Sequence, residues 1–147
     1  MKQCALADLS AREQRLVNEA VAVRQKAYAP YSHYKVGAAL WDDHDQLHTG
    51  CNVEGADFTL TTHAEMSALN AMVKSGVLKL KVIAVAVKSD IGHGMPCGLC
   101  RQKIKEFSAD RQVRVIGINL DAAEQIQAIF VSDLEELLPY SFGPNFL

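Results

Sequence analysis

The sequence predicts an α/β fold, a three-layer α-β-α sandwich built around a mixed five-stranded sheet. Segments with helical periodicity alternate along the chain with short segments rich in β-branched and small apolar residues. Residues 81–88, KVIAVAVK, are almost continuously apolar, which is typical of a strand covered on both faces. With 147 residues and 49% hydrophobic residues, the chain can bury one core, so residues 1–147 are expected to form one domain.

The first segment predicts a helix followed by a hairpin. Ser10 and Glu13 form an S-x-x-E capping box, and the apolar stripe that follows is stopped at Pro30. The stripe has helical spacing and comprises Leu16, Val17, Ala20, Val23 and Ala27. Residues 34–41 and 46–53, separated by the turn-rich DDHDQ, predict the two strands of the hairpin.

The middle of the chain predicts a second helix and the central strand. Apolar positions recur at helical spacing between residues 64 and 75, and Gly76 stands at the C-terminal capping position. Residues 81–88 supply the central strand, and a loop then leads into a helix from Cys97 to about residue 107.

The last third predicts another strand at residues 112–120. Residues 123–131, AEQIQAIFV, are compatible with a further strand or with a short irregular segment. Ser132 begins a second S-x-x-E pattern, which predicts a short helix that ends before Pro139.

Composition narrows the class of partner. The formal net charge is −2, and basic residues form no block that would bind a nucleic-acid backbone, so a small molecule is the expected ligand. No apolar run approaches the roughly 20 residues that span a bilayer, and the first residues turn polar too early for a signal peptide. The expected location is cytoplasmic, with no membrane partner.

Two cysteines are spaced as metal ligands. Cys97 and Cys100 form a C-x-x-C pair at the start of a predicted helix, where free backbone N–H groups stabilise thiolates, so two sulfurs can converge on one Zn²⁺. Cys4 is expected in a mobile N-terminus, and Cys51 lies in a predicted strand with no partner spacing. This leaves His63, at the head of the other helix, as the third ligand. Three ligands leave one position open for water, the arrangement of a catalytic site.

Glu65 stands two residues after the histidine, where its carboxylate can move protons without binding the metal. Taken alone, His63 would be a core or capping histidine, and Cys97 and Cys100 could be a redox pair. Neither alternative explains Glu65. The other histidines lie near predicted turns and are expected to be solvated; they are His33, His44, His48 and His93.

The H-x-E and P-C-x-x-C patterns together form a zinc-deaminase signature. The chain resembles the cytidine deaminase family, with YAPYSHYKVGAAL, GCNVEGADF, THAE, PCGLCRQ and ELLPYSFGP in the order in which the family has them. The resemblance covers about residue 27 to the C-terminus. It implies a cytidine deaminase-like fold and one Zn²⁺ per subunit.

The resemblance also implies roles for residues outside the metal motif. Asn52 and Glu54 match the pair that binds the ribose 3′-hydroxyl, and Tyr34 falls where the family usually has a Phe that packs on the nucleoside. Ala64 lies within the catalytic triplet, and Phe142 matches an aromatic residue that reaches a neighbouring subunit's site. These matches imply a homotetramer with shared active sites.

The sequence departs from the family pattern at two places. His63 and Met66 stand where short-chain members usually have Cys and Arg, respectively. One neutral imidazole and two thiolates balance the zinc charge, so no Arg is needed to compensate it. Gly55, Asp57 and Phe58 replace an Asn, a small residue and a Tyr. This second change predicts tolerance toward C4- or N4-substituted pyrimidines.

The expected activity is hydrolytic deamination of cytidine and deoxycytidine to uridine and deoxyuridine, as in pyrimidine salvage. The alternative within enzymes is a deaminase of another small heterocycle, of the blasticidin S or guanine type. A non-catalytic zinc-stabilised binding module would tolerate replacement of Glu65, and polynucleotide editing is disfavoured by the absence of a basic block.

Overall fold

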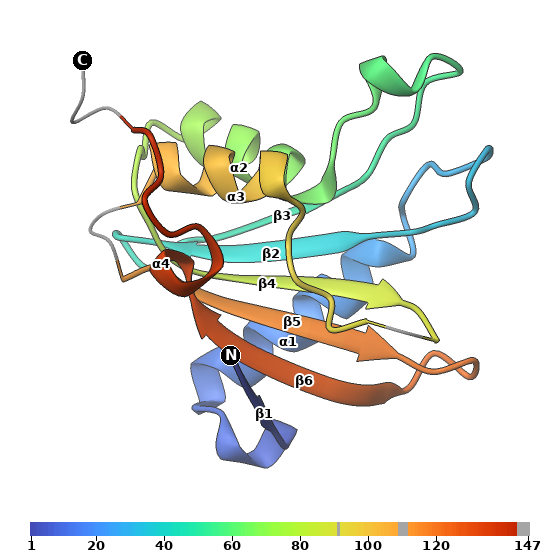
Figure 1. The fold of residues 1–147 in the computed structure, drawn as a ribbon, viewed down its shortest axis with the longest axis horizontal. Helices are drawn as coiled ribbons and strands as arrows, with labels where there is room; N and C mark the ends of the chain where they lie inside the picture. The colour runs from blue at the N-terminus through green and yellow to red at the C-terminus, as the bar shows by residue number, and fades with distance from the viewer. Residues whose placement is uncertain (91, 109–111, 144–147) are drawn as a thin grey trace.

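The computed structural model describes residues 1–90, 92–108 and 112–143. They form a six-stranded sheet in the order β1-β6-β5-β4-β2-β3, shown in Figure 1. The strands are β1 (Lys2–Cys4), β2 (Gly37–Asp42), β3 (Leu47–Cys51), β4 (Leu80–Lys88), β5 (Arg114–Leu120) and β6 (Ile126–Asp133). Only β4 and β5 pair in parallel, and the other neighbours are antiparallel, so the predicted mixed sheet is confirmed.

The sheet has one strand more than predicted. The additional strand, β1, has three residues and pairs with the edge of β6. Its sequence, KQC, is too short to show an alternating pattern. The segment left open at residues 123–131 supplies most of β6.

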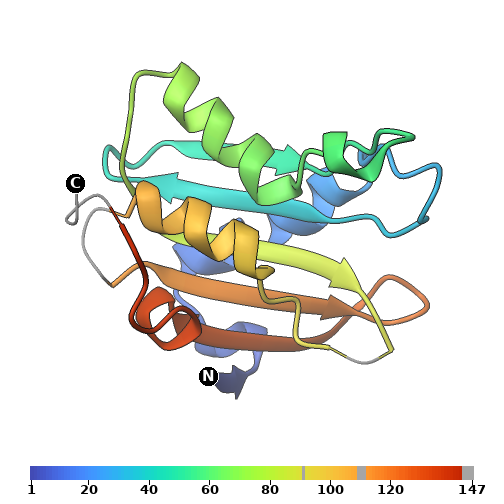
Figure 2. The same ribbon diagram turned by 45° about the horizontal axis from the view of Figure 1, so that its top comes forward.

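Helices cover both faces of the sheet, as the apolar sequence of β4 predicts. They are α1 (Ala11–Arg24), α2 (Ala64–Lys74), α3 (Gly98–Glu106) and α4 (Leu134–Leu137), with 3-10 turns η1 (Leu6–Asp8) and η2 (Phe58–Leu60). α1 lies on one face, and α2 and α3 lie side by side on the other (Figures 1 and 2). None of the helices in the described residues is both long and apolar enough to cross a bilayer.

Two apolar cores lie on opposite faces of the sheet. β4 contributes Ile83 and Val85 to the core beneath α2 and α3, and Ala84 and Ala86 to the core beneath α1. Successive side chains of a strand point to opposite faces, so the buried positions of β4 pack alternately against the two helical layers. The central position of β4 in the sheet is confirmed.

Two helix boundaries differ from the sequence expectation. The Ser10 and Glu13 capping box starts α1, but the helix ends at Arg24 because Tyr28 pairs with Val53 instead of continuing the helix toward Pro30. The second predicted capping box is wrong. Ser132 lies inside β6, its hydroxyl contacts Glu136, and Asp133 occupies the N-cap position of α4 without a side-chain capping bond.

Glycine allows α2 to approach the sheet closely. A Cβ atom at Gly50, in β3, would lie 2.6 Å from both the carbonyl oxygen of Ala64 and the Cβ of Ser67. α2 therefore begins directly on the strand. At its other end, Gly76 adopts a φ of 90°, which confirms the predicted C-terminal cap.

Candidate metal centre and active site

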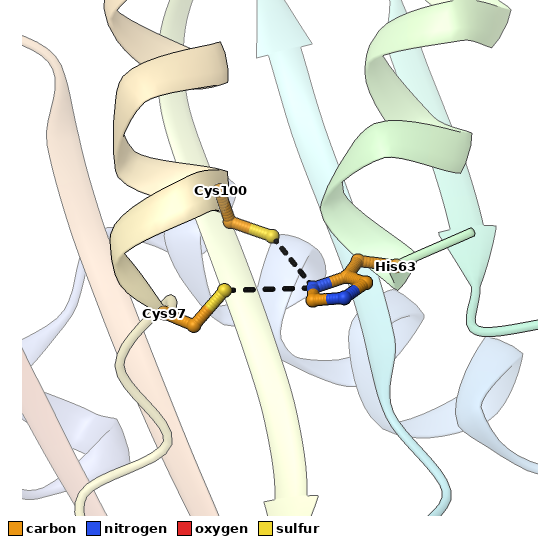
Figure 3. Close-up of side chains that lie close together, drawn as sticks. All are labelled: His63, Cys97 and Cys100. Carbon is orange, nitrogen blue, oxygen red and sulfur yellow. Dashed lines mark hydrogen bonds between the residues drawn. The ribbon is translucent and has the colours of Figure 1, made fainter. Parts of the chain in front are cut away.

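The residues predicted to bind the metal come together at two helix N-termini. His63 is the N-cap residue of α2, Cys97 is the N-cap residue of α3, and Cys100 lies in the first turn of α3. The Nδ1 atom of His63 lies 3.2 Å from Sγ of Cys100 and 3.5 Å from Sγ of Cys97. Dashed lines mark both contacts in Figure 3. The three ligand atoms all lie within 4.8 Å of one another.

This donor set fits zinc. Tetrahedral zinc, with bonds of about 2.0 Å to nitrogen and 2.3 Å to sulfur, holds its ligand atoms roughly 3.5 to 3.8 Å apart. The His63 nitrogen and the two sulfurs lie close to that spacing before any adjustment. Burial raises the pKa of the Cys100 thiol, so a bound cation would supply the charge that favours its thiolate form.

The remaining cysteines take no part in this group. Cys4 lies in β1 and Cys51 ends β3, and the ligand group found among the described residues contains neither of them. Three protein ligands leave one position of a tetrahedron for water or substrate, as expected of a catalytic site rather than a structural one.

Glu65 lies beside the metal ligands without joining them. It is the second residue of α2, and its side chain is buried, with 4% exposed. Burial raises the pKa of its carboxyl, and the opposing effects of its own backbone N–H, of Cys100 and of His63 are smaller. A carboxyl with a raised pKa is suited to accept and return protons near neutral pH.

A cavity of about 400 Å³ opens beside Glu65 and the metal ligands. Most of the residues singled out in the sequence contribute to its wall: Tyr34, Asn52, Glu54, His63, Ala64, Glu65 and Cys97. Cys100 is fully buried behind it. A pocket of this size that joins apolar walls to a few convergent polar groups is typical of a small-molecule site.

Asn52 and Glu54 face the cavity while they hold its wall together. The Asn52 amide donates to the carbonyl of Tyr34 at 2.9 Å and accepts from the backbone N–H of Val36 at 2.8 Å. The Glu54 carboxylate accepts from the backbone N–H groups of Tyr31 and Ser32. Both side chains thus tie the segment after β3 to the segment before β2.

The altered segment after Glu54 contributes unequally to the pocket. Phe58 lines the cavity, whereas Asp57 is exposed and caps η2 by accepting from the backbone N–H of Thr59 at 3.0 Å. The added carboxylate of Asp57 is therefore committed to a turn. Phe142 is 60% exposed and is not among the described residues that line the cavity.

Sequence reasoning missed two polar contacts. Ser32 lines the cavity and hydrogen-bonds to Glu54, although the motif YAPYS gave no signal for that contact. The expectation that His48 is solvated is wrong. Its side chain is only 9% exposed, and its Nε2 atom lies 2.8 Å from a carboxylate oxygen of the buried Asp42.

A family model for the cytidine and deoxycytidylate deaminase zinc-binding region matches residues 10–116, which include all three ligands and Glu65. The chain belongs to this deaminase family. The predicted family resemblance is thereby confirmed, and zinc is the metal that the His63, Cys97 and Cys100 site of this deaminase is built to hold.

Relatives of this deaminase extend over most of the chain. A cytidine deaminase of Halalkalibacterium halodurans is 40% identical over 131 residues, which cover 88% of this chain and 92% of the relative. One from Sporosarcina psychrophila is 39% identical over 94 residues, 64% of this chain and 68% of the relative. The crystal structure of cytidine deaminase from Burkholderia pseudomallei superposes with a TM-score of 0.79 at 34% identity, covering 91% of this chain and all of that one.

Proposed function

We propose that this chain catalyses the zinc-dependent hydrolytic deamination of cytidine and deoxycytidine to uridine and deoxyuridine, with release of ammonia. One observation carries the proposal: a single cavity joins Glu65 and two of the metal ligands, His63 and Cys97, to Asn52 and Glu54, polar groups suited to a sugar. The relatives described above, which carry the name cytidine deaminase, support the same substrate. A guanine or blasticidin S deaminase is the less favoured alternative.

The chain's own residues divide the chemistry between them. When bound, zinc supplies a water of lowered pKa at the open coordination position. Glu65 takes a proton from that water and passes it to N3 of the pyrimidine ring as the water oxygen bonds to C4. Glu65 then takes the proton of the new C4 hydroxyl and delivers it to the amine, which leaves as ammonia when the C4–N4 bond breaks. Its burial excludes bulk water from these transfers, because only 4% of the residue is exposed.

The remaining wall residues hold the nucleoside. Asn52 keeps one amide N–H beyond its bond to Tyr34, and Glu54 accepts, so together they can bind one sugar hydroxyl. Tyr34 and Phe58 offer aromatic faces on which the nucleoside can pack, and Ala64 adds only a methyl group to the cavity wall. With the sugar held by Asn52 and Glu54, the base would extend across the cavity and place its amino-bearing carbon beside the metal ligands.

We further propose that residues 1–147 act as one catalytic domain in a cytoplasmic homotetramer of pyrimidine salvage. Phe142 is 60% exposed, and completing a neighbouring subunit's cavity is the role proposed for its ring. Phe58, which lines the cavity, and Tyr31, whose ring packs edge-on against it, are also exposed and would be covered by the same contact.

A substrate panel tests the proposal. Cytidine and deoxycytidine should be converted with release of ammonia, whereas guanine and blasticidin S should be left intact. Phe58 lines the pocket where the family has a Tyr, and Gly55 follows the lining residue Glu54; these two departures from the family pattern support tolerance of N4-methylcytidine. Undetectable conversion of N4-methylcytidine would refute only the proposed tolerance of N4 substituents and leave the cytidine assignment intact. Conversion of guanine but not of cytidine would overturn the substrate assignment.

A further inference from the structure

The Glu54 carboxylate is held by one short loop. Its Oε2 atom accepts from the backbone N–H of Tyr31 at 3.0 Å and from that of Ser32 at 3.2 Å. Its Oε1 atom accepts from the Ser32 hydroxyl. Glu54 is only 7% exposed, and these bonds hold the pKa of its carboxyl below the ordinary range, with the Ser32 hydroxyl as the largest cause.

The count of hydrogen bonds leaves one acceptor position. An ionised carboxylate has about four lone-pair positions, two on each oxygen. The two backbone N–H groups occupy both positions of Oε2, and Ser32 occupies one position of Oε1. The position that remains is on Oε1, the atom that Ser32 holds, and Glu54 lines the cavity.

Ser32 also joins this carboxylate to Tyr34, another residue of the cavity wall. Its hydroxyl oxygen accepts from the backbone N–H of Tyr34 at 3.0 Å, so one side chain connects Glu54 to the wall formed by Tyr34. His33, between them, has a φ of 57°, a left-handed backbone conformation within this loop. Ser32 therefore sets both the direction of the carboxylate and its distance from the aromatic wall.

We propose that Ser32 is a positioning residue for nucleoside deamination, which aims the free acceptor position of Glu54 at one hydroxyl of the substrate's sugar. This inference rests on the proposed function, in which Glu54 binds the 3′-hydroxyl. Without the Ser32 hydroxyl, the carboxylate keeps its two backbone bonds on Oε2 but loses the bond that orients Oε1.

Two substrates and three variants of the zinc-loaded enzyme test the proposal. Deoxycytidine and 2′,3′-dideoxycytidine differ only in the 3′-hydroxyl. Ser32→Ala should lower kcat/KM for deoxycytidine by about tenfold, mainly through KM, because a hydrogen bond that orients a charged group is lost. It should lower kcat/KM for dideoxycytidine by less than about twofold, since that substrate cannot use the contact.

Two further variants serve as controls. Ser32→Thr keeps the hydroxyl and should restore most of the activity on deoxycytidine. Ser75→Ala removes a serine hydroxyl that donates to the carbonyl of Met72 at the far end of α2, and it should leave the activity on both substrates unchanged.

The outcomes separate this inference from the function on which it rests. Equal losses on both substrates, or no loss on either, would show that Ser32 does not act through the sugar and would overturn the proposal. If the wild-type enzyme converts both substrates equally well, Glu54 makes no useful contact with the 3′-hydroxyl, and the inference about Ser32 is overturned with it. A wild-type enzyme that converts neither would refute the proposed function itself.

Discussion

The Nδ1 atom of His63 lies 3.2 Å from the Sγ atom of Cys100, a residue 37 positions further along the chain. The two atoms meet because α2 and α3 lie side by side on one face of the sheet, with both N-termini at the same end (Figure 2). A helix N-terminus stabilises an adjacent thiolate through its free N–H groups. The fold itself therefore brings the metal ligands together.

Replacement of Cys100 tests this arrangement. Cys100→Ala should reduce bound zinc from about one per chain to near zero. It should also lower the free energy of unfolding by about 2–4 kcal/mol, because a fully buried side chain and the metal are both lost. Elemental analysis and denaturant unfolding measure the two effects. Cys51→Ala, which removes a thiol outside the ligand group, is the matched control, and retention of zinc by Cys100→Ala would contradict the site.

The close approach of α2 to β3 predicts a second effect on the metal. An added methyl group at Gly50 would contact the carbonyl of Ala64 and force the start of α2 away from the strand, and His63 with it. Gly50→Ala should therefore weaken both folding and zinc affinity. Gly37→Ala is the control: its methyl group would meet Arg24 in α1, on the other face of the sheet, so folding should weaken while zinc affinity is kept.

Zinc affinity of the two folded variants can be compared by competition with a chelator. Equal affinities would show that contact between β3 and α2 does not position His63.

The shared-site proposal predicts recovery of activity from two inactive variants. In a tetramer in which Phe142 reaches a neighbour, Phe142→Ala and Glu65→Gln each disable every site of their own homo-oligomer. Random co-assembly in equal amounts should rebuild about one quarter of the sites, because each requires an intact Glu65 from one chain and an intact Phe142 from its neighbour. Activity after co-expression measures this, and no recovery in verified mixed oligomers would contradict a shared site.

The Asp42 and His48 pair predicts how stability depends on pH. Burial alone would raise the pKa of Asp42, but hydrogen bonds from the backbone N–H of Gln46, from His48 and from the backbone N–H of His44 together hold it below its ordinary value. A lowered folded-state pKa stabilises the protein above the unfolded-state pKa of about 3.9, and this stability is lost as pH falls through the folded-state pKa.

Asp42→Asn removes this contribution. Its free energy of unfolding should be lower than that of the wild type by about 1–3 kcal/mol at pH 7, and the difference should shrink below about pH 4. Denaturant unfolding at both pH values measures it. Asp45→Asn, at an exposed position nearby, should change stability little. A difference that persists unchanged at low pH would mean that the charge of Asp42 is not its cause.

Local sequence signals predicted the helices and pointed to three residues that the structure brings together. The Ser10 capping box, the stripe of α2 and the apolar run of β4 each depend on residues within one element, and the structure contains all three. Cys97 and Cys100 were recognisable because their spacing is fixed by one helical turn. His63 required the added step of excluding other ligands.

Contacts between distant segments could not be read in the same way. Ser32 reaches Glu54 only because Tyr28 pairs with Val53, and no periodicity in the sequence reports that pairing. His48 was expected in solvent because it follows a turn, yet the register of the hairpin buries it against Asp42. The strand that was not predicted, β1, is too short to carry a pattern of its own.

The central claim is that this deaminase uses Glu65 to move protons at a zinc site. The most direct test measures the loss of cytidine absorbance with wild type and with Glu65→Gln, with zinc content determined for both. The account predicts that wild type converts cytidine, and that the variant holds as much zinc but is slower by at least about a hundredfold. Equal activity of a zinc-replete Glu65→Gln enzyme, or a zinc-loaded wild type that leaves cytidine unchanged, would contradict it.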